Sequence, residues 1–307
     1  MNKIAVILPA YNEELTIKDC ILDFHKSVPN AQIIIVNNNS SDETKKIAEE
    51  TLKHHNIDGE VIDEDRQGKG YAVRTAFKKT EADIYILSDA DLTYPASEAL
   101  KMVEILIKNN ADMIVGDRHS LGGYAKENKR KFHNFGNNIV AYLINKLFRS
   151  NLKDIMSGFR VFNRKFIKNY PILVNGFELE TDMTLHSLDK RLKVVEHPIE
   201  YKDRPEGSES KLNTIADGAK VLFAIFQLLR HYRPMVFFGL LTIIFSILGI
   251  FSGIPAILDY IQTGFVEHLP LAVLATGLEV LALISLSIGL ILDSINHQNR
   301  MNFEKNY

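Results

Sequence analysis

Cysteine is almost absent from this chain of 307 residues, in which Cys20 is the single one, and tryptophan is missing altogether. One cysteine cannot build an internal disulfide framework or a multi-cysteine metal site, which suits a reducing compartment. An excess of charge is missing too, because the formal net charge is −2. This balance gives no reason to expect nucleic acid or another charged polymer as a partner.

Two familiar sequence signals are also missing. No positively charged stretch followed by an apolar one stands at the start, where Met1 to Leu8 runs into a strand-like pattern. We therefore expect no cleavable signal peptide. The segment "RQGKGYAV" (66–73) has Val73 where a dinucleotide-binding fingerprint needs a third glycine, which disfavours a nicotinamide or flavin site.

Charge is scarce in two runs near the C-terminus. Residues 235–257 carry no charged side chain, and residues 269–292 carry only Glu279. Each run is long enough to cross the hydrocarbon core of a bilayer, and both lie together after a polar region, so we predict two transmembrane helices rather than two core helices. Glu279 is costly to expose to lipid, and we expect it to face another helix or an interface.

Basic residues flank this pair of runs. Arg230 and Arg233 precede the first run, and Arg300 and Lys305 follow the second, whereas the connection 258–268 has no Lys or Arg. The positive-inside rule then predicts that both ends of the chain are cytoplasmic. The predicted parts are a cytoplasmic catalytic domain (1–212), an amphipathic juxtamembrane helix (213–233), two transmembrane helices within 234–292, and a cytoplasmic tail (293–307).

Runs rich in Ile and Val alternate with amphipathic helical patterns in the first half. This alternation predicts an α/β domain with a mostly parallel, doubly wound sheet. The predicted strands are Lys3–Leu8, Gln32–Val36, Glu60–Ile62, Asp83–Leu87 and Met113–Val115. The predicted helices are Glu13–Ser27, Asp42–His54, Lys69–Lys79 and Ala96–Lys108.

A polar cluster follows each of the first four strands. The clusters are "PAYNEE" (9–14), "NNNSSDET" (37–44), "DEDRQGKG" (63–70) and "SDADLTYP" (88–95). Each alone reads as a solvated turn. In a parallel sheet, however, all four lie at one edge, where ligands bind.

Asp89 and Asp91 stand at the end of an apolar strand, where two anions would repel each other without a partner. Carboxylates in this arrangement suit Mg²⁺ or Mn²⁺, which complete their shells with water and substrate phosphate oxygens. The sequence therefore predicts a divalent cation that holds a diphosphate. The alternative is a pair of turn-forming aspartates before Pro95.

With these motifs the chain resembles the glycosyltransferase family 2 enzymes, which have a Rossmann-like GT-A fold. Within them it is similar to the membrane-anchored polyprenyl-phosphate (dolichyl-phosphate) mannosyl- and glucosyltransferases. The likeness runs from "ILPAYNEE" (7–14) to the paired C-terminal runs. It implies metal-dependent, inverting transfer of a hexose from a nucleotide-diphosphate sugar to a polyprenyl phosphate, either dolichyl or undecaprenyl.

The resemblance also implies roles for residues on the donor side. The expected donor-nucleotide contacts are Pro9, Ala10, Tyr11, Glu13, Asn38, Lys69 and Asp89, with Arg74 nearby and with Asp89 and Asp91 on the metal. Four positions in two loops depart from the family pattern: Asn37–Asn39 replace Asp-Asp-Gly, and Thr93 stands where the mannosyltransferases usually have Gln. An amide still offers a donor and an acceptor to a base edge.

On the acceptor side, "DIMSGFRVFNR" (154–164) and "PIEYKDRPEGSESKL" (198–212) match family motifs. The resemblance implies that the acceptor phosphate is held by Arg118, Arg130, Arg160, Arg204 and Lys211. Arg160 as an ordinary surface cation is the alternative. The basic run 126–131 could be a solvated loop, a site of attraction to anionic lipid headgroups, or part of the acceptor-phosphate site.

The expected catalytic residues are Asp89, Asp91, Arg160 and Asp182. Glu178, Glu180 and Asp182 match the region where hydroxyl-using relatives place a base, and Asp182 is the preferred candidate; acids that favour a helix N-terminus are the alternative. Two rival functions stay open, transfer to a glycolipid or glycan hydroxyl and non-catalytic binding at a membrane. A homo-oligomer is also left open.

Overall fold

A computed structural model of the chain describes residues 2–121, 131–176, 178–202, 226–227 and 229–307. The chain divides into two compact units. The first comprises residues 1–215 together with Tyr307, and the second comprises residues 216–306.

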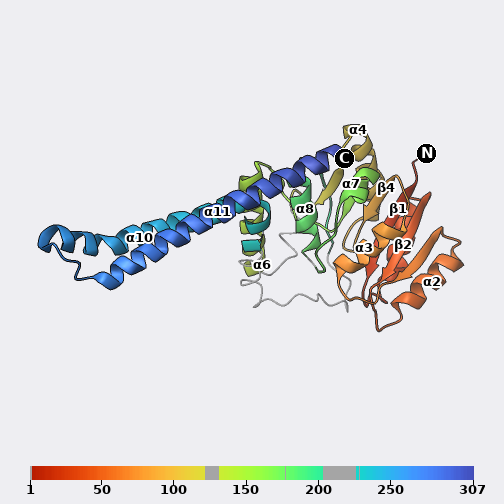
Figure 1. The fold of residues 1–307 in the computed structure, drawn as a ribbon. Coiled ribbons are helices and arrows are strands. Elements are labelled where there is room, and N and C mark those ends of the chain that lie inside the picture. The colour runs from red at the N-terminus through yellow and green to blue at the C-terminus, as the bar shows by residue number, and fades with distance from the viewer. Residues whose placement is uncertain (1, 122–130, 177, 203–225, 228) are drawn as a thin grey trace. The chain divides into compact units, whose positions relative to one another are not determined.

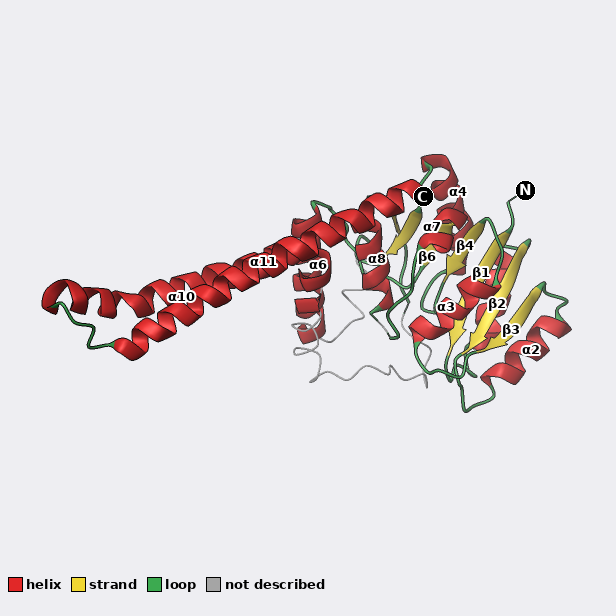
Figure 2. Cartoon of the chain, viewed as in Figure 1, coloured by secondary structure: helices red, strands yellow, loops and turns green. Residues whose placement is uncertain are grey.

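The first unit is built on a seven-stranded sheet with the strand order β3-β2-β1-β4-β6-β5-β7 (Figures 1 and 2). Its strands are β1 (Ile4–Ala10), β2 (Ala31–Asn37), β3 (Gly59–Asp63), β4 (Ile84–Leu87), β5 (Met113–Asp117), β6 (Arg160–Asn163) and β7 (Val194–Pro198). All of these run in one direction except β6, which pairs antiparallel with β4 and β5. The predicted mostly parallel α/β sheet is confirmed.

Helices cover both faces of the sheet, which explains why its central strands are apolar throughout. Val6 and Leu8 of β1 face a cluster that includes α1 (Ile17–Ser27), α2 (Thr44–His54) and α4 (Ala99–Asn109). The opposite face carries α3 (Lys69–Lys79) and α7 (Arg164–Asn169), against which α8 (Leu179–Asp189) packs through an edge-to-face contact of His186 with Phe166. Among the described residues, this unit also contains α6 (Lys131–Phe148).

Most predicted elements form where the sequence pattern placed them, and α3 has the predicted bounds. The first helix begins at Ile17 rather than Glu13, because residues 13–16 form a turn in which Thr16 N donates to Glu13 O at 3.1 Å. The helix predicted at Ala96 begins as a 3₁₀ turn, η1 (Ala96–Glu98), before α4.

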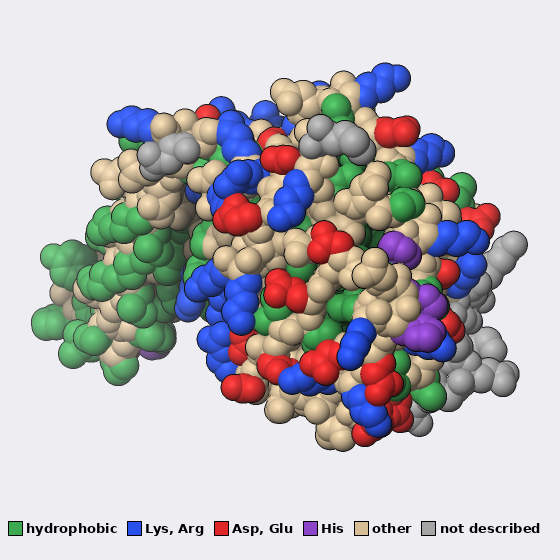
Figure 3. Space-filling view, turned by 90° about the vertical axis from the view of Figure 1, so that its right-hand side faces the viewer, with side chains coloured by type: hydrophobic (Ala, Val, Ile, Leu, Met, Phe, Trp, Pro, Cys, Tyr) green, Lys and Arg blue, Asp and Glu red, His purple; other side chains and the backbone are tan. Residues whose placement is uncertain are grey.

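The second unit is a helical hairpin of α10 (Pro234–Thr263) and α11 (Leu269–Asn306). Thr242 Oγ1 donates to the carbonyl of Ala282 at 3.3 Å and links the two helices. Their outward surface is mostly hydrophobic (Figure 3), as for Phe251 and Leu283. Both helices are long and apolar enough to cross a membrane. The predicted juxtamembrane helix, 213–233, lies mostly outside the described residues.

Candidate active site

The carboxyl ends of β1 to β4 bring the four predicted polar clusters to one edge of the sheet. The antiparallel strand β6 adds a fifth segment to this edge, because it begins there: Arg160 pairs with Leu87, the last residue of β4. The residues just before β6, Asp154 to Phe159, therefore meet the loop that carries Asp89 and Asp91.

Asp91 is held inside a tight turn after β4. Its Oδ1 accepts hydrogen bonds from the backbone N–H of Thr93 at 3.1 Å and from the Thr93 hydroxyl at 2.5 Å. Leu92 between them has φ 64°, which the turn requires. Asp91 and Thr93 are both buried, so the carboxylate orientation is fixed before any ligand arrives.

Asp89 makes an ion pair with Lys69, from the first turn of α3. The same ammonium lies 2.5 Å from Oε1 of Glu180, near the start of α8. Three segments far apart in sequence thus meet at one cation. Burial alone would lower the pKa of the Lys69 ammonium, but the charges of Asp89 and Glu180 outweigh it and raise that pKa. The two acids therefore favour the charged form of Lys69.

Gly158 makes room for this ion pair. A Cβ atom at this position would lie 2.9 Å from Asp89 Oδ2 and 3.1 Å from Lys69 Nζ, so any larger residue would push the pair apart. The Gly158 N–H donates to the hydroxyl of Tyr94 at 2.8 Å, which fixes the loop before β6 against the loop after β4.

The site suits a divalent cation by its donor chemistry. Asp89 and Asp91 present hard carboxylate oxygens at one strand end, and the Asp89 side chain is partly exposed to solvent. Within the described residues, no group of three or more His, Cys, Asp and Glu side chains is arranged to hold a metal. A cation here would need oxygen atoms from substrate or water to complete its shell.

Asn38 binds the loop after β2 to the loop after β3. Its amide nitrogen donates to the carbonyls of Arg66 at 2.7 Å and Glu64 at 3.4 Å, and its oxygen accepts from the Gly68 N–H at 2.7 Å. The preceding Asn37 donates to Asp63 Oδ1 at 2.9 Å. The side chain of Asn38, expected at the nucleotide base, thus shapes the loops around that position.

The other predicted donor residues lie at the end of β1 and just after it. Pro9 and Ala10 end the strand, and the Ala10 carbonyl accepts from the Asn38 N–H at 2.8 Å. Tyr11 follows and is half-buried. Glu13 accepts from the Thr16 hydroxyl at 3.1 Å.

Arg118, predicted at the acceptor phosphate, forms a two-point ion pair with Asp154 at 2.7 and 2.9 Å. Its guanidinium lies over the ring of Tyr201, 5.5 Å from the centroid. Burial would raise the pKa of Asp154, but the bonds from Arg118 outweigh burial and lower it. Arg118 thereby fastens the loop before β6 to the end of β5.

Arg160 is fully buried. Its guanidinium donates to the carbonyls of Ser157 and Ile155, each at 2.8 Å, and to Thr184 Oγ1 at 3.0 Å, while burial lowers its pKa. Burial excludes the surface-cation alternative and gives Arg160 a supporting role beneath the site, whereas its contact with the acceptor phosphate stays a prediction.

Among the acids of α8, Glu180 faces Lys69, whereas Asp182 accepts from the Tyr170 hydroxyl at 2.6 Å. The sequence favoured Asp182 over Glu180 as the candidate base, and only the folded structure shows that Glu180 is the one that contacts Lys69. The sequence analysis also did not predict Gly158 and Tyr94 as site residues. Arg130, Arg204 and Lys211 lie outside the described residues.

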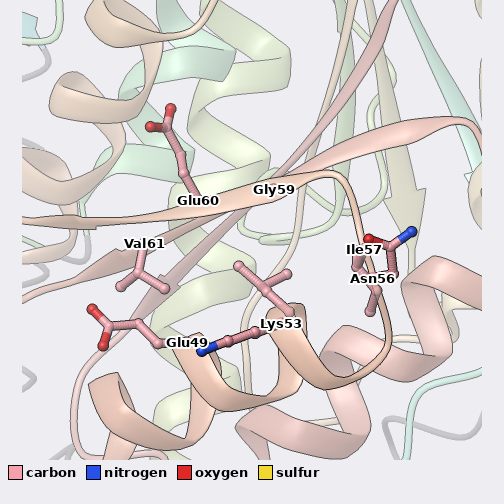
Figure 4. Close-up of a pocket in the computed structure, with 8 residues that line it drawn as sticks. Glu49, Lys53, Asn56, Ile57, Gly59, Glu60 and Val61 are labelled. Carbon is pink, nitrogen blue, oxygen red and sulfur yellow. The ribbon is translucent and has the colours of Figure 1, made fainter.

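A hollow of about 400 Å³ lies elsewhere, between the end of α2 and the start of β3 (Figure 4). It is lined by Lys53, Asn56 and Gly59 among others. This is the amino end of β3, opposite the edge where the polar loops meet, so the hollow does not belong to the site.

Comparison with known proteins identifies the family. Residues 5–170, more than half of the chain, match the model of glycosyl transferase family 2. A dolichol-phosphate mannosyltransferase of Pyrococcus furiosus is 30% identical over 260 residues, 82% of this chain and 69% of that protein. A dolichyl-phosphate hexose transferase of Haloferax volcanii is 26% identical over 220 residues, 72% and 91% of the two chains.

The fold has solved counterparts as well. Glucosyl-3-phosphoglycerate synthase from Mycobacterium tuberculosis, in complex with Mn²⁺, UDP and glucosyl-3-phosphoglycerate, matches 75% of this chain and 79% of its own with a TM-score of 0.57 and 20% identity. At that identity the likeness concerns the fold. Together with the acids after β4 and the residues gathered around them, the family match makes this chain a member of glycosyltransferase family 2.

Proposed function

We propose that this enzyme transfers a hexose from a nucleotide-diphosphate sugar to a polyprenyl phosphate. One observation carries the proposal: a family 2 catalytic unit and two helices long and apolar enough to cross a bilayer belong to the same chain. A lipid acceptor stays in the bilayer, and a tethered enzyme meets it more often. The similarity to relatives named for dolichyl-phosphate chemistry extends over most of the chain and supports this acceptor.

The acceptor chemistry needs little proton transfer. A phosphate monoester is already anionic near neutral pH, so its oxygen can attack without a general base. In accord with this, Asp182, the candidate base, is engaged by the Tyr170 hydroxyl. One displacement at the anomeric carbon would invert its configuration. The chain's task is then to align the two substrates and to exclude water.

The donor would lie at the carboxyl edge of β1 to β4. The Asn38 bonds would hold the loops on the nucleotide side, and the turn that orients Asp91 would place its carboxylate beside the diphosphate. A Mg²⁺ or Mn²⁺ ion on Asp89 and Asp91 would stabilise the negative charge that grows on the departing nucleoside diphosphate. The Mn²⁺ and UDP bound in the mycobacterial counterpart support this choice.

The proposed membrane arrangement places the catalytic unit and both ends of the chain in the cytoplasm. Arg230 and Arg233 before α10 and Arg300 and Lys305 in the last part of α11 are the basic flanks that favour this orientation. Nucleotide sugars would then reach the site from the cytosol.

The test uses the full chain in proteoliposomes with polyprenyl phosphate and a panel of radiolabelled nucleotide sugars. We expect one donor to give a lipid-linked product that mild acid releases, because a glycosyl phosphate is acid-labile. Asp91→Asn should abolish the product, and Glu81→Gln, an exposed acid at the other end of β4, should not. An alkali-stable glycoside would identify a hydroxyl acceptor, and no transfer to phosphate with any donor would refute the proposal.

A further inference from the structure

Lys69 forms an ion cluster with two acids, Asp89 and Glu180, whereas a simple ion pair has one. Lys69 contacts both Asp89 and Glu180, and only Asp89 belongs to the pair of acids suited to a divalent cation. A metal ion at Asp89 would meet an ammonium that is already bonded to one of its two carboxylate oxygens, Oδ1. Two cations cannot share that carboxylate cheaply, because like charges at contact distance repel.

The three side chains differ in how far they are exposed. The Asp89 side chain is 30% exposed, whereas those of Lys69 and Glu180 are 10% and 7% exposed. A ligand that arrives from solvent therefore reaches Asp89 first. The Lys69–Glu180 contact lies deeper and can persist after Asp89 has turned to a new partner.

The backbone around Lys69 is fixed, so any rearrangement falls to the side chain. Gly68 has φ 145°, and the Gly70 N–H donates to the carbonyl of Asn175 at 3.1 Å. A Cβ at Gly70 would lie 2.2 Å from the carbonyl oxygen of Val174, so this start of α3 packs tightly on the segment before α8. The Lys69 stem thus emerges from an anchored turn between two acids.

We propose that Lys69 is a built-in counter-ion that holds Asp89 in the empty enzyme and is retained by Glu180 when a divalent cation takes Asp89. This inference rests on the cation site of the proposed function and adds an exchange device to it. Glu180 is then a positioning residue that keeps the displaced ammonium paired within the protein. Without it, Lys69 would stay on Asp89 and compete more strongly with the metal, since a buried charge needs a partner.

The test measures Mn²⁺ affinity directly, by electron paramagnetic resonance of the purified full chain with and without nucleoside diphosphate. Glu180→Gln should weaken Mn²⁺ binding about tenfold, but a simple loss of negative charge would do the same. The deciding variant is Lys69→Met with Glu180→Gln, because it removes one charge of each sign. We expect it to bind Mn²⁺ roughly tenfold more tightly than the wild type, since Asp89 no longer has a competing cation.

Two controls keep the outcome interpretable. Glu81→Gln removes a surface acid paired with Arg164 and Lys168, and its Mn²⁺ affinity should equal that of the wild type. Thermal unfolding without metal shows that each variant is folded. If the double variant binds Mn²⁺ no more tightly than the wild type, and the wild type transfers hexose to polyprenyl phosphate, the proposed exchange at Lys69 is refuted and the proposed function stands. If the wild type does not transfer hexose to polyprenyl phosphate but the Mn²⁺ affinities are as expected, only the proposed function is refuted.

Discussion

The side-chain oxygen of Asn38 accepts a hydrogen bond from the backbone N–H of Gly68 at 2.7 Å, across 30 residues of sequence. The nitrogen of the same amide donates to the carbonyl of Arg66 at 2.7 Å. An amide can make both bonds, whereas an aspartate has only acceptors. The replacement of the family's acid by asparagine is therefore explained by the loop that it braces.

Asn38→Asp should destabilise the catalytic unit. The carboxylate would face the carbonyls of Arg66 and Glu64 without a proton to donate, and an unsatisfied buried group costs about 1–3 kcal/mol. The midpoint of thermal unfolding of the detergent-solubilised chain measures the loss. Asn39→Asp is the matched control, because Asn39 is exposed, and its midpoint should not change. Equal midpoints for the two variants would contradict the bracing role.

Arg160→Lys tests whether this residue supports the fold or binds phosphate. A lysine nitrogen cannot reach the carbonyls of Ser157 and Ile155 and the Thr184 hydroxyl together, so we expect a loss of about 3 kcal/mol in the free energy of unfolding. Arg164→Lys, at an exposed ion pair with Glu81, should cost less than about 1 kcal/mol. A raised KM for the lipid acceptor with unchanged stability would instead indicate a phosphate contact.

Gly158→Ala should reduce activity far more than stability. The added methyl group would lie 2.9 Å from Asp89 Oδ2, and a displacement of about 1 Å at a reacting site costs roughly 10²-fold in rate. Steady-state kinetics on the full chain measure kcat, and thermal unfolding measures the fold. Gly277→Ala is the control, since no other heavy atom lies within 4 Å of its Cβ position. A kcat equal to that of the wild type would show that catalysis does not need the close approach of Gly158 to Asp89.

The sheet was largely predictable because buried parallel strands have a strong sequence pattern. The run Ile33–Val36 is apolar at every position and could only be a buried strand or a short piece of helix. β6 was harder, because its four residues begin with an arginine that looks exposed in sequence. Its antiparallel direction brings Gly158 to Asp89, and no local pattern carries that information.

The site was predictable in part, for a physical reason. Asp89 and Asp91 follow a strong strand, so the sheet geometry alone places them at the ligand-binding edge. Which acid of "ELETD" faces Lys69 depends on the rotation of α8, and the buried residues of this helix are spread around it, so the sequence does not reveal the side that faces the site. Glu180 is therefore found only when the helix is packed.

Acid should weaken the catalytic unit through His186. Burial lowers the pKa of this imidazole to about 4, aided by Lys190, whereas the unfolded chain has a pKa near 6.5. Between these values the unfolded state binds the proton and the folded state does not, so stability falls as pH drops from about 6.5 to about 4. The full loss is about 3 kcal/mol at most.

His186→Phe keeps a ring against Phe166 and Tyr170 and cannot titrate. Its unfolding midpoint should therefore fall less than that of the wild type over this pH range. His54→Gln, at an exposed histidine, should follow the wild-type curve. Parallel curves for His186→Phe and the wild type would mean that His186 does not contribute to the acid sensitivity.

Glu279 packs into a gap on α10 that a glycine provides. A Cβ at Gly249 would lie 2.6 Å from Glu279 Oε1, and the Ser246 hydroxyl donates to Oε2 at 3.2 Å. In a bilayer such a group needs a polar partner, so the contact should fix the register of the two helices. Gly249→Leu should separate them, whereas Glu279→Gln should preserve the Ser246 contact.

Disulfide cross-linking in membranes measures this register. Thr242→Cys with Ala282→Cys places a thiol on each helix where they are already in contact, in a Cys20→Ser background that removes the natural thiol. We expect efficient cross-linking in this pair and in the pair with Glu279→Gln, and weak cross-linking once Gly249→Leu is added. Gly239→Leu, where no other heavy atom lies within 4 Å of the Cβ position, is the control for helix bulk. If Gly249→Leu and Gly239→Leu cross-link equally well, the glycine gap does not determine how the helices pack.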